Sequence, residues 1–380
     1  MPRSNFTQRG VATGSRRCPQ CGDVWPALGD YFYERGNGRL ELCQGPATRN
    51  CRTRYFREYA ARTRATRAAT IAAAGQSGRK FGVELEFIGS ASAVCRAMRA
   101  AGLECNQENY GHSVPRAWKI VPDSSVRNGA ELVSPPLSGD AGRDEVRRAC
   151  AALVAAGATV NGSTGLHVHH DATDLTVRAW GRLFRLWAAC QDGTDAILAP
   201  SRRRTGGGGH WAQPLTDRHV MGAEALARNH PADRPLPTGA VYDFISRGDR
   251  YYSLNADPYG RQGTIECRQH QGTTNGAKVL AWIEYAQAFF AYAQGDGPIP
   301  GDGTDLAATL AALSDHGALS PVTAAYLTTR AATIARRATR ERATLGASAV
   351  DDTCTDDYSA CQCSECVEDR GETPATGDEW

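Results

Sequence analysis

The chain has 380 residues, a formal net charge of +2 and a hydrophobic fraction of 41%. This composition is typical of a globular protein, and the length leaves room for one large core with accessory segments or for two to three domains. No apolar run is long enough to span a membrane, and no signal-peptide core follows Met1. We therefore expect a cytoplasmic protein without a membrane partner.

The charge is distributed unevenly between the two ends of the chain. Residues 1–79 contain fourteen arginines and five acidic residues, which give +9, whereas residues 351–380 contain ten acidic residues and one arginine, which give −9. A basic segment favours contact with nucleic acid or another polyanion, and an acidic tail is usually solvated or acts as an intramolecular decoy. Eight of the thirteen cysteines cluster at the two ends, which indicates metal ligands and buried thiols rather than disulfides.

The N-terminal segment contains a candidate zinc site. We predict that residues 1–17 are disordered, that residues 18–54 form a zinc-finger-like module, and that residues 55–79 form a basic helix and a linker. Zinc takes four ligands, and so small a segment has too little core to fold without the ion. A C-x2-C pair at Cys18 and Cys21, followed by Cys43, Cys51 and a basic segment, resembles the treble-clef zinc fingers of phage and nuclease-associated proteins. This resemblance implies docking to nucleic acid or protein. A purely structural role is the alternative. The four candidate ligands are Cys18, Cys21, Cys43 and Cys51.

Residues 350–380 form an acidic tail with a second group of cysteines. The C-x-C-x2-C spacing is compatible with another zinc site, and a disordered tail with incidental thiols is the alternative. The candidate zinc ligands of the tail are Cys354, Cys361, Cys363 and Cys366.

The main domain, predicted over residues 80–349, begins with a strand over residues 81–87. Apolar residues alternate there with Glu84 and Glu86, so both carboxylates lie on the same face. Two adjacent acids aimed at a packed region repel each other unless a cation neutralises them, and Mg²⁺ or Mn²⁺ prefers carboxylate oxygens. An edge strand with a solvated acidic face is the alternative.

A hairpin is predicted next, over residues 118–123 and 130–134. Asn128-Gly129 lies between these two apolar runs and is a strong turn signal. The hairpin sets Asp123 and Glu131 near one another. Helices are expected before and after it, over residues 91–102 and 142–156.

A loop rich in Gly and Ser then leads into a strand with three histidines. Because side chains alternate along a strand, His167 and His169 share one face, while Leu166, Val168 and His170 take the other. Two histidines on one strand face after such a loop favour a metal-binding or phosphate-binding role. Histidines satisfied within the core or at the surface are the alternative.

The part between Pro200 and Arg250 lacks a regular pattern. Basic residues, a run of glycines and scattered prolines predict a long mobile loop of the kind that covers or lines a binding site. Arg202 and Arg203 are candidate phosphate-binding residues, and a solvated basic loop is the alternative. Helices are expected on both sides of this loop, over residues 174–198, 277–293, 304–313 and 320–345.

Two more strands follow this loop. Residues 251–255 include Asn255, a candidate nucleotide-binding residue, and residues 263–268 place Glu266 and Arg268 on one face. A carboxylate beside a guanidinium suits a combined metal and phosphate site. A surface salt bridge is the alternative.

The acids and imidazoles singled out above all fall on predicted strands or strand ends. Five carboxylates on one sheet would repel each other strongly, and two or three divalent ions would relieve this and leave positions for phosphate oxygens. Arg268 and the basic loop fit charge stabilisation of a transferred phosphoryl group. No G-x4-G-K-[ST] motif is present, which excludes a P-loop. The full set is Glu84, Glu86, Asp123, Glu131, His167, His169 and Glu266.

Four stretches, in this order along the chain, resemble the amidoligase family, which has the glutamine-synthetase and glutamate–cysteine-ligase fold. They are residues 81–87, 123–136, 161–169 and 264–268. The resemblance implies an α+β fold in which helices pack a glutamine-synthetase-like antiparallel sheet whose concave face is acidic and binds metal. The small N-terminal zinc-binding module would be added to this domain.

The resemblance also implies a role for each residue. The implied ligands of Mg²⁺ or Mn²⁺ are Glu84, Glu86, Asp123, Glu131, His167 and Glu266. The residues implied to bind ATP are His169, Arg202, Arg203, Asn255 and Arg268. The implied catalytic residues are Arg268 and Glu131.

The implied activity is ATP-dependent ligation of a carboxylate to an amine. A small-molecule or peptide carboxylate attacks the γ-phosphoryl group to give an acyl phosphate and ADP, and an amine then displaces phosphate to form an amide. One alternative is a zinc-finger protein that binds nucleic acid or protein, with a ligase-like domain that binds nucleotide without turnover. Another is metal-dependent hydrolysis of a phosphoester by the same carboxylates.

Overall fold

The computed structural model divides the chain into two compact units, Met1–Ala69 and Thr70–Trp380. In the first unit, four short strands form two antiparallel pairs: β1 (Ser15–Arg17) with β2 (Val24–Pro26), and β3 (Phe32–Glu34) with β4 (Leu40–Cys43). Besides these strands, the structure describes residues 78–111, 113–126, 128–203, 212–241 and 250–345.

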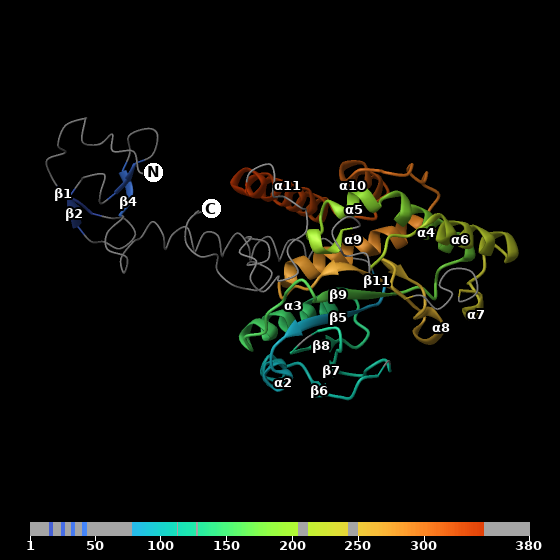
Figure 1. Cartoon of the computed structure of the whole chain (residues 1–380), viewed down its shortest axis with the longest axis horizontal. Helices are drawn as coiled ribbons and strands as arrows, with labels where there is room; N and C mark the ends of the chain where they lie inside the picture. The colour runs from blue at the N-terminus through green and yellow to red at the C-terminus, as the bar shows by residue number, and fades with distance from the viewer. Residues whose placement is uncertain are drawn as a thin grey trace. The chain divides into compact units, whose positions relative to one another are not determined.

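The second unit is built on a seven-stranded sheet. Its strands are β5 (Phe81–Ile88), β6 (Cys105–Gln107), β7 (Trp118–Pro122), β8 (Gly129–Val133), β9 (Gly165–Asp171), β10 (Leu254–Asn255) and β11 (Thr264–Gln271). They lie in the order β10-β11-β9-β5-β8-β7-β6, so strands far apart in the sequence become neighbours (Figure 1). Every pair is antiparallel as predicted, except β6 with β7, which is parallel. The three-residue β6 is too short to show a periodic pattern, and the sequence did not predict it.

Alternation along the central strands separates an apolar face from a polar face. Val83, Leu85, Val168 and Ile265 point to the apolar face, where each is at most 1% exposed. His170 lies on this face too, as predicted, with its ring 5.1 Å from the ring of Phe290. Burial and, to a smaller extent, the nearby Arg79 guanidinium hold the pKa of His170 well below its ordinary value, so the ring is neutral.

Helix α9 (Gly276–Gln294) covers the apolar face and confirms the helix predicted over residues 277–293 (Figure 1). Asn275 begins it by accepting hydrogen bonds from the backbone N–H groups of Ala277 and Lys278. Because the helix is apolar on all sides, it is buried between the sheet and an outer layer of helices. These are α3 (Gly139–Ala155), α4 (Val177–Ala189), α10 (Leu306–Asp315) and α11 (Pro321–Leu345), while α2 (Ala91–Ala100) packs on α3 and β6.

The region from Pro200 to Arg250 is more regular than predicted. It contains η2 (Pro200–Arg202), α6 (Asp217–Asn229) and α7 (Thr238–Val241). The prediction of a continuous loop is therefore wrong at α6, which Thr216 and His219 begin with a capping box and which packs on α4. The scattered glycines and prolines around this helix obscured its apolar periodicity.

Two predicted elements are shorter than expected. The helix predicted over residues 174–198 is interrupted at Cys190, after which α5 (Gln191–Asp195) begins. Of the strand predicted over residues 251–255, only β10 pairs in the sheet, and α8 (Tyr259–Gln262) then leads into β11. None of the helices in the described ranges has the length and the apolar content that crossing a membrane requires.

The β7–β8 hairpin has the predicted turn. Asn128 adopts a left-handed conformation with φ of 58°, which suits an asparagine better than most residues. A Cβ atom at Gly129 would lie only 2.1 Å from the Phe87 carbonyl oxygen, so this position needs a glycine. The turn thereby sets the register that places Glu131 of β8 opposite Val121 of β7.

Candidate active site

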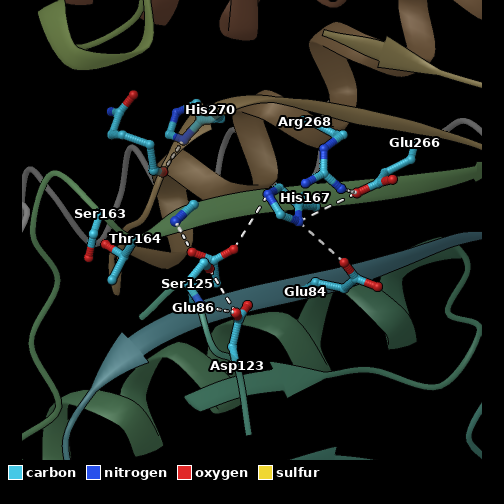
Figure 2. Close-up of polar contacts among 12 residues, drawn as sticks. Glu84, Glu86, Asp123, Ser125, Ser163, Thr164, His167, Glu266, Arg268 and His270 are labelled. Atoms are coloured by element: carbon cyan, nitrogen blue, oxygen red, sulfur yellow. Dashed lines mark hydrogen bonds and ion pairs between the residues drawn. The ribbon is translucent and has the colours of Figure 1, made fainter. Parts of the chain in front are cut away.

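Neighbouring strands of the sheet present acids and imidazoles on the polar face (Figure 2). Three pairs oppose each other in the sheet register: Glu84 and His167, Glu86 and Glu131, and Glu266 and His169. A cavity of about 870 Å³ lies over this face, and all six side chains line it. Strand pairing thus brings together residues that are up to 182 positions apart in the sequence.

His167 lies at the centre of this cluster and is 7% exposed. Its Nδ1 atom is 3.3 Å from Glu84 Oε2 and 3.4 Å from Glu266 Oε1, while its Nε2 atom is 3.6 Å from Glu86 Oε1. Figure 2 shows these three carboxylates around the ring. One imidazole therefore contacts acids from the two strands beside its own.

His169 lies two residues further along β9, beside the same glutamate. Its Nε2 atom is 3.1 Å from Glu84 Oε1, and its Nδ1 atom is 3.0 Å from Thr264 Oγ1. Burial by itself lowers the pKa of His169, but the Glu84 carboxylate outweighs it and raises the pKa above its ordinary value. Burial likewise raises the pKa of Glu84, yet the charges and hydrogen bonds of His169 and His167 hold it well below the ordinary range.

Glu266 connects the histidines to a guanidinium. Its Oε1 atom accepts a hydrogen bond of 2.5 Å from Arg268 Nη1, and its Oε2 atom accepts one of 2.8 Å from Asn255 Nδ2. Burial raises the pKa of Glu266, but Arg268 and the two histidines outweigh burial and lower it. The carboxylate is therefore ionised, and it fixes Arg268 at the edge of the acidic cluster.

Among the acids of this cluster, the Glu131 carboxylate receives the least stabilisation from hydrogen bonds and positive charges. Glu86 accepts a hydrogen bond of 2.7 Å from the Gly165 N–H, whereas no side chain or N–H among the described residues donates to the Glu131 carboxylate. Burial, followed by the negative charges of Glu84 and Glu86, holds the pKa of Glu131 well above its ordinary value. A cation at this position would remove the repulsion.

The cluster contains two overlapping groups with the geometry of metal ligands. One oxygen or nitrogen from each of Glu84, His167 and Glu266 lies within 4.8 Å of the others, and the same holds for Glu86, Glu131 and His167. Carboxylate oxygens suit Mg²⁺ and Mn²⁺, and an imidazole is compatible with Mn²⁺ and related ions. The donor set and the uncompensated charge of Glu131 therefore fit a divalent-metal site.

Replacing Glu131 tests whether its carboxylate destabilises the protein when no ion is bound, and the measured quantity is the thermal stability. Between the ordinary pKa of a glutamate and the raised value in the folded state, the folded protein binds the proton and the unfolded chain does not. The free energy of unfolding of the ion-free protein therefore falls as pH rises through this window.

We expect Glu131→Gln to raise the unfolding temperature in EDTA, and the gain to be larger at about pH 8 than at about pH 5. Thermal unfolding at both pH values, with and without Mg²⁺, measures this, and the stabilisation by Mg²⁺ should shrink in the variant. A wild-type protein more stable than the variant in EDTA at the higher pH would contradict the account.

Asp123 lines the same cavity but belongs to neither group. It follows β7, and its Oδ1 atom accepts hydrogen bonds of 2.7 Å from the N–H and the hydroxyl of Ser125. The predicted hairpin thus brings Asp123 to the cavity, but its carboxylate is not among the two groups that have the geometry of metal ligands.

The two predicted arginines of the basic segment differ in position. Arg202 is 5% exposed and lines the cavity, where its Nη2 atom donates to the carbonyl oxygens of Ser163 at 3.3 Å and Thr164 at 2.5 Å. Arg203 does not line the cavity, and its Nε atom donates to the Leu198 carbonyl at 3.0 Å. Adjacent residues point in different directions here, so only Arg202 reaches the candidate site.

A lysine on the polar face was not predicted from the sequence. Lys119 of β7 lines the cavity with its side chain 3% exposed, and its Nζ atom donates to the carbonyl oxygens of Gly111 and Ser113. It therefore holds the loop between β6 and β7 against the cavity wall. The signal in the sequence is the alternation of side chains along the strand. Trp118 and Ile120 are apolar and buried, so Lys119 between them points to the polar face.

The side chains of the eight candidate zinc ligands lie outside the described residues. Residues 55–77 of the helix and linker predicted over residues 55–79, and the whole acidic tail of residues 350–380, also lie outside the described residues. Zinc binding and docking through these segments stay predictions.

Comparisons with known proteins identify a related family. Residues 77–290, more than half of the chain, match the family described as "Putative amidoligase enzyme". No curated protein shows significant similarity to the chain. Among solved structures, the chain is similar to a "novel glutamine synthase homolog" with 14% sequence identity and a TM-score of 0.36, over 72% of this chain and 68% of that chain. This structural similarity is too low to carry a functional assignment.

Proposed function

The chain belongs to the amidoligase family of enzymes, and from this premise we propose that it is an ATP-dependent carboxylate–amine ligase. The reaction joins a small-molecule or peptide carboxylate to an amine through an acyl phosphate, at a site that binds Mg²⁺ or Mn²⁺. One observation carries the proposal: two carboxylate–histidine groups and the Arg268 guanidinium converge on the wall of one cavity.

We assign metal binding to the acids of the two groups and to the imidazole that they share. Divalent ions held there would neutralise the phosphates of ATP and align them for in-line attack. A neutral imidazole binds a metal through one nitrogen and keeps a proton on the other, so His167 would serve one group at a time. Asp123 would join them through its Oδ2 atom, because both hydrogen bonds from Ser125 are to Oδ1.

We assign nucleotide binding to four residues of the cavity wall: His169, Arg202, Asn255 and Arg268. Arg268 adds positive charge beside Glu266, where the transferred phosphoryl group would be stabilised. Asn255 holds the other oxygen of Glu266 and thereby limits the orientations of that carboxylate. Arg203 is left out of the proposed site because it lies outside the cavity wall.

In the proposed reaction, an oxygen of the substrate carboxylate attacks the γ-phosphorus, and the bond to ADP breaks. The amine nitrogen then attacks the acyl carbon, the bond to phosphate breaks, and the nitrogen loses a proton as the amide forms. Arg268 stabilises the charge on the phosphoryl oxygens in the first step. We propose Glu131 as the second catalytic residue because its carboxylate faces the cavity at the end of the cluster away from Arg268.

Release of ADP from full-length protein tests the proposal. The protein would be incubated with ATP and Mg²⁺ and with mixtures of carboxylates and amines, including peptides. ADP formation that requires both a carboxylate and an amine, together with an amide product, supports a ligase. Cleavage of DNA or another phosphoester without ADP formation would favour metal-dependent hydrolysis instead. ATP binding without turnover under every condition would favour a non-catalytic nucleotide-binding domain.

We propose that two segments outside the catalytic domain of residues 80–349 bind zinc. Zinc analysis of the purified full-length protein should give about one ion for each intact group of four cysteines. We expect Cys18→Ser to lower the zinc content by about one ion per chain and to leave ADP formation unchanged. A wild-type protein free of zinc after purification without chelators would contradict both zinc sites.

A further inference from the structure

Two segments from opposite edges of the sheet meet over the cavity. β10 and β6 are the edge strands; Arg250 and Tyr251 precede β10, and Tyr110 follows β6. All three residues line the cavity on the polar face. Neighbouring strands are about 4.8 Å apart, so the six steps across a flat sheet of this order would separate its edges by about 29 Å. Side chains alone cannot span that separation, which indicates that both segments extend over the polar face.

Side chains make the contact between the two segments. The Arg250 guanidinium lies over the Tyr251 ring, 5.3 Å from its centroid, and its Nη2 atom donates to the Tyr251 hydroxyl oxygen at 3.5 Å. Hydrogen bonds to the hydroxyl groups of Tyr251 and of Tyr110 raise the pKa of Arg250 above its ordinary value, so the guanidinium stays charged. Arg250 therefore joins a tyrosine from each edge of the sheet. We call these three residues the clasp.

The backbone on each side of the clasp is anchored independently of it. Lys119, whose side chain is 3% exposed, donates from Nζ to the carbonyl oxygen of Gly111 at 3.2 Å, directly after Tyr110. On the other side, the N–H of Gln213 donates to the carbonyl oxygen of Tyr251 at 2.7 Å. These bonds hold both segments in position whether or not the side chains of the clasp touch.

The clasp itself faces solvent. Tyr110 is 59% exposed, and Arg250 is exposed as well. Exposed side chains change rotamer within picoseconds to nanoseconds, and substitutions of exposed residues usually change stability little. The clasp can therefore break and re-form while the backbone on both sides stays in place. Its effect is on the route into the cavity rather than on the stability of the fold.

We propose that the clasp is a gate for the cavity. When it is closed, water and ions pass around it to the acids of the polar face, whereas larger molecules enter and leave only when Arg250 separates from Tyr110. The gate acts on any ligand of the cavity. The inference therefore goes beyond the proposed function and does not depend on which reaction the site performs.

A cysteine placed inside the cavity reports on the gate without any ligand. Val133 of β8 is half-buried, lines the cavity and lies opposite Glu84 and Lys119 in the sheet register. Full-length Val133→Cys would be modified with N-ethylmaleimide and with fluorescein maleimide, which share a reactive group and differ in size. Mass spectrometry of the peptide that contains residue 133 gives both rates and separates this thiol from the other cysteines.

The measured quantity is the rate with fluorescein maleimide divided by the rate with N-ethylmaleimide. We expect this ratio to rise by at least about tenfold when Arg250→Ala is added to Val133→Cys, because the gate is then open. Tyr110→Phe, which removes only a hydroxyl group, should raise the ratio in the same direction. The unfolding temperatures should stay close to that of Val133→Cys alone, since the added substitutions are at exposed residues.

Arg261→Ala is the matched control. Arg261 is also an exposed arginine that lines the cavity, and it lies outside the clasp, so its removal should leave the ratio unchanged. A ratio that Arg250→Ala does not change, or that Arg261→Ala raises to the same degree, would overturn the inference. Neither result bears on ADP formation, so the gate and the proposed function can fail separately.

Discussion

Glu84→Gln should lower ADP formation by at least about 10²–10³-fold while the protein stays folded. Glu84 lies 3.3 Å from His167 and 3.1 Å from His169, and it belongs to the proposed metal-binding group that contains Glu266, the partner of Arg268. Glutamine keeps the shape of the side chain and removes the negative charge that a divalent ion requires. The measurement is steady-state ADP release in Mg²⁺, together with circular dichroism and the unfolding temperature of the variant.

Glu224→Gln is the matched control for this variant. Glu224 lies on α6, where it is 41% exposed and forms an ion pair of 2.8 Å with Arg185. An exposed pair of this kind contributes little to stability, so activity and fold should both be close to wild type. Full activity in well-folded Glu84→Gln would remove Glu84 from the chemistry and with it the metal-binding group to which we assign it.

Arg268→Ala should lower ADP formation by about 10³–10⁵-fold, the range expected when an arginine that stabilises a transferred phosphoryl group is removed. Arg268 is held by Glu266 at 2.5 Å, and its side chain is 13% exposed, so the guanidinium is already oriented before substrate binds. Burial lowers the pKa of Arg268, but the acids of the cluster, Glu266 first, outweigh burial and raise it, so the positive charge persists at every accessible pH.

Arg268→Lys separates the charge from the geometry. Lysine supplies a point charge without the planar fork, so we expect activity between that of wild type and that of Arg268→Ala. Arg178→Ala is the surface control, since Arg178 is 50% exposed and pairs with Asp296 on the protein surface. Equal rates for Arg268→Ala and wild type would show that this guanidinium does not act on the phosphoryl group.

The local pattern of the sequence predicted the polar face correctly. Alternation placed Glu84 with Glu86, and His167 with His169, on shared strand faces, and the structure shows both pairs on the cavity wall. Alternation follows from the geometry of an extended backbone, so it can be recognised without knowledge of the strand's neighbours. The α+β class and the helix that covers the apolar face follow from similarly local signals.

The sequence by itself therefore determined which residues point the same way along each strand. Only the tertiary structure decided which strands are neighbours, because hydrogen bonding between β9, β5, β8 and β11 joins segments that no local pattern connects. That order places His167 beside two groups of acids, and the fold around η2 brings Arg202, but not Arg203, to the cavity wall.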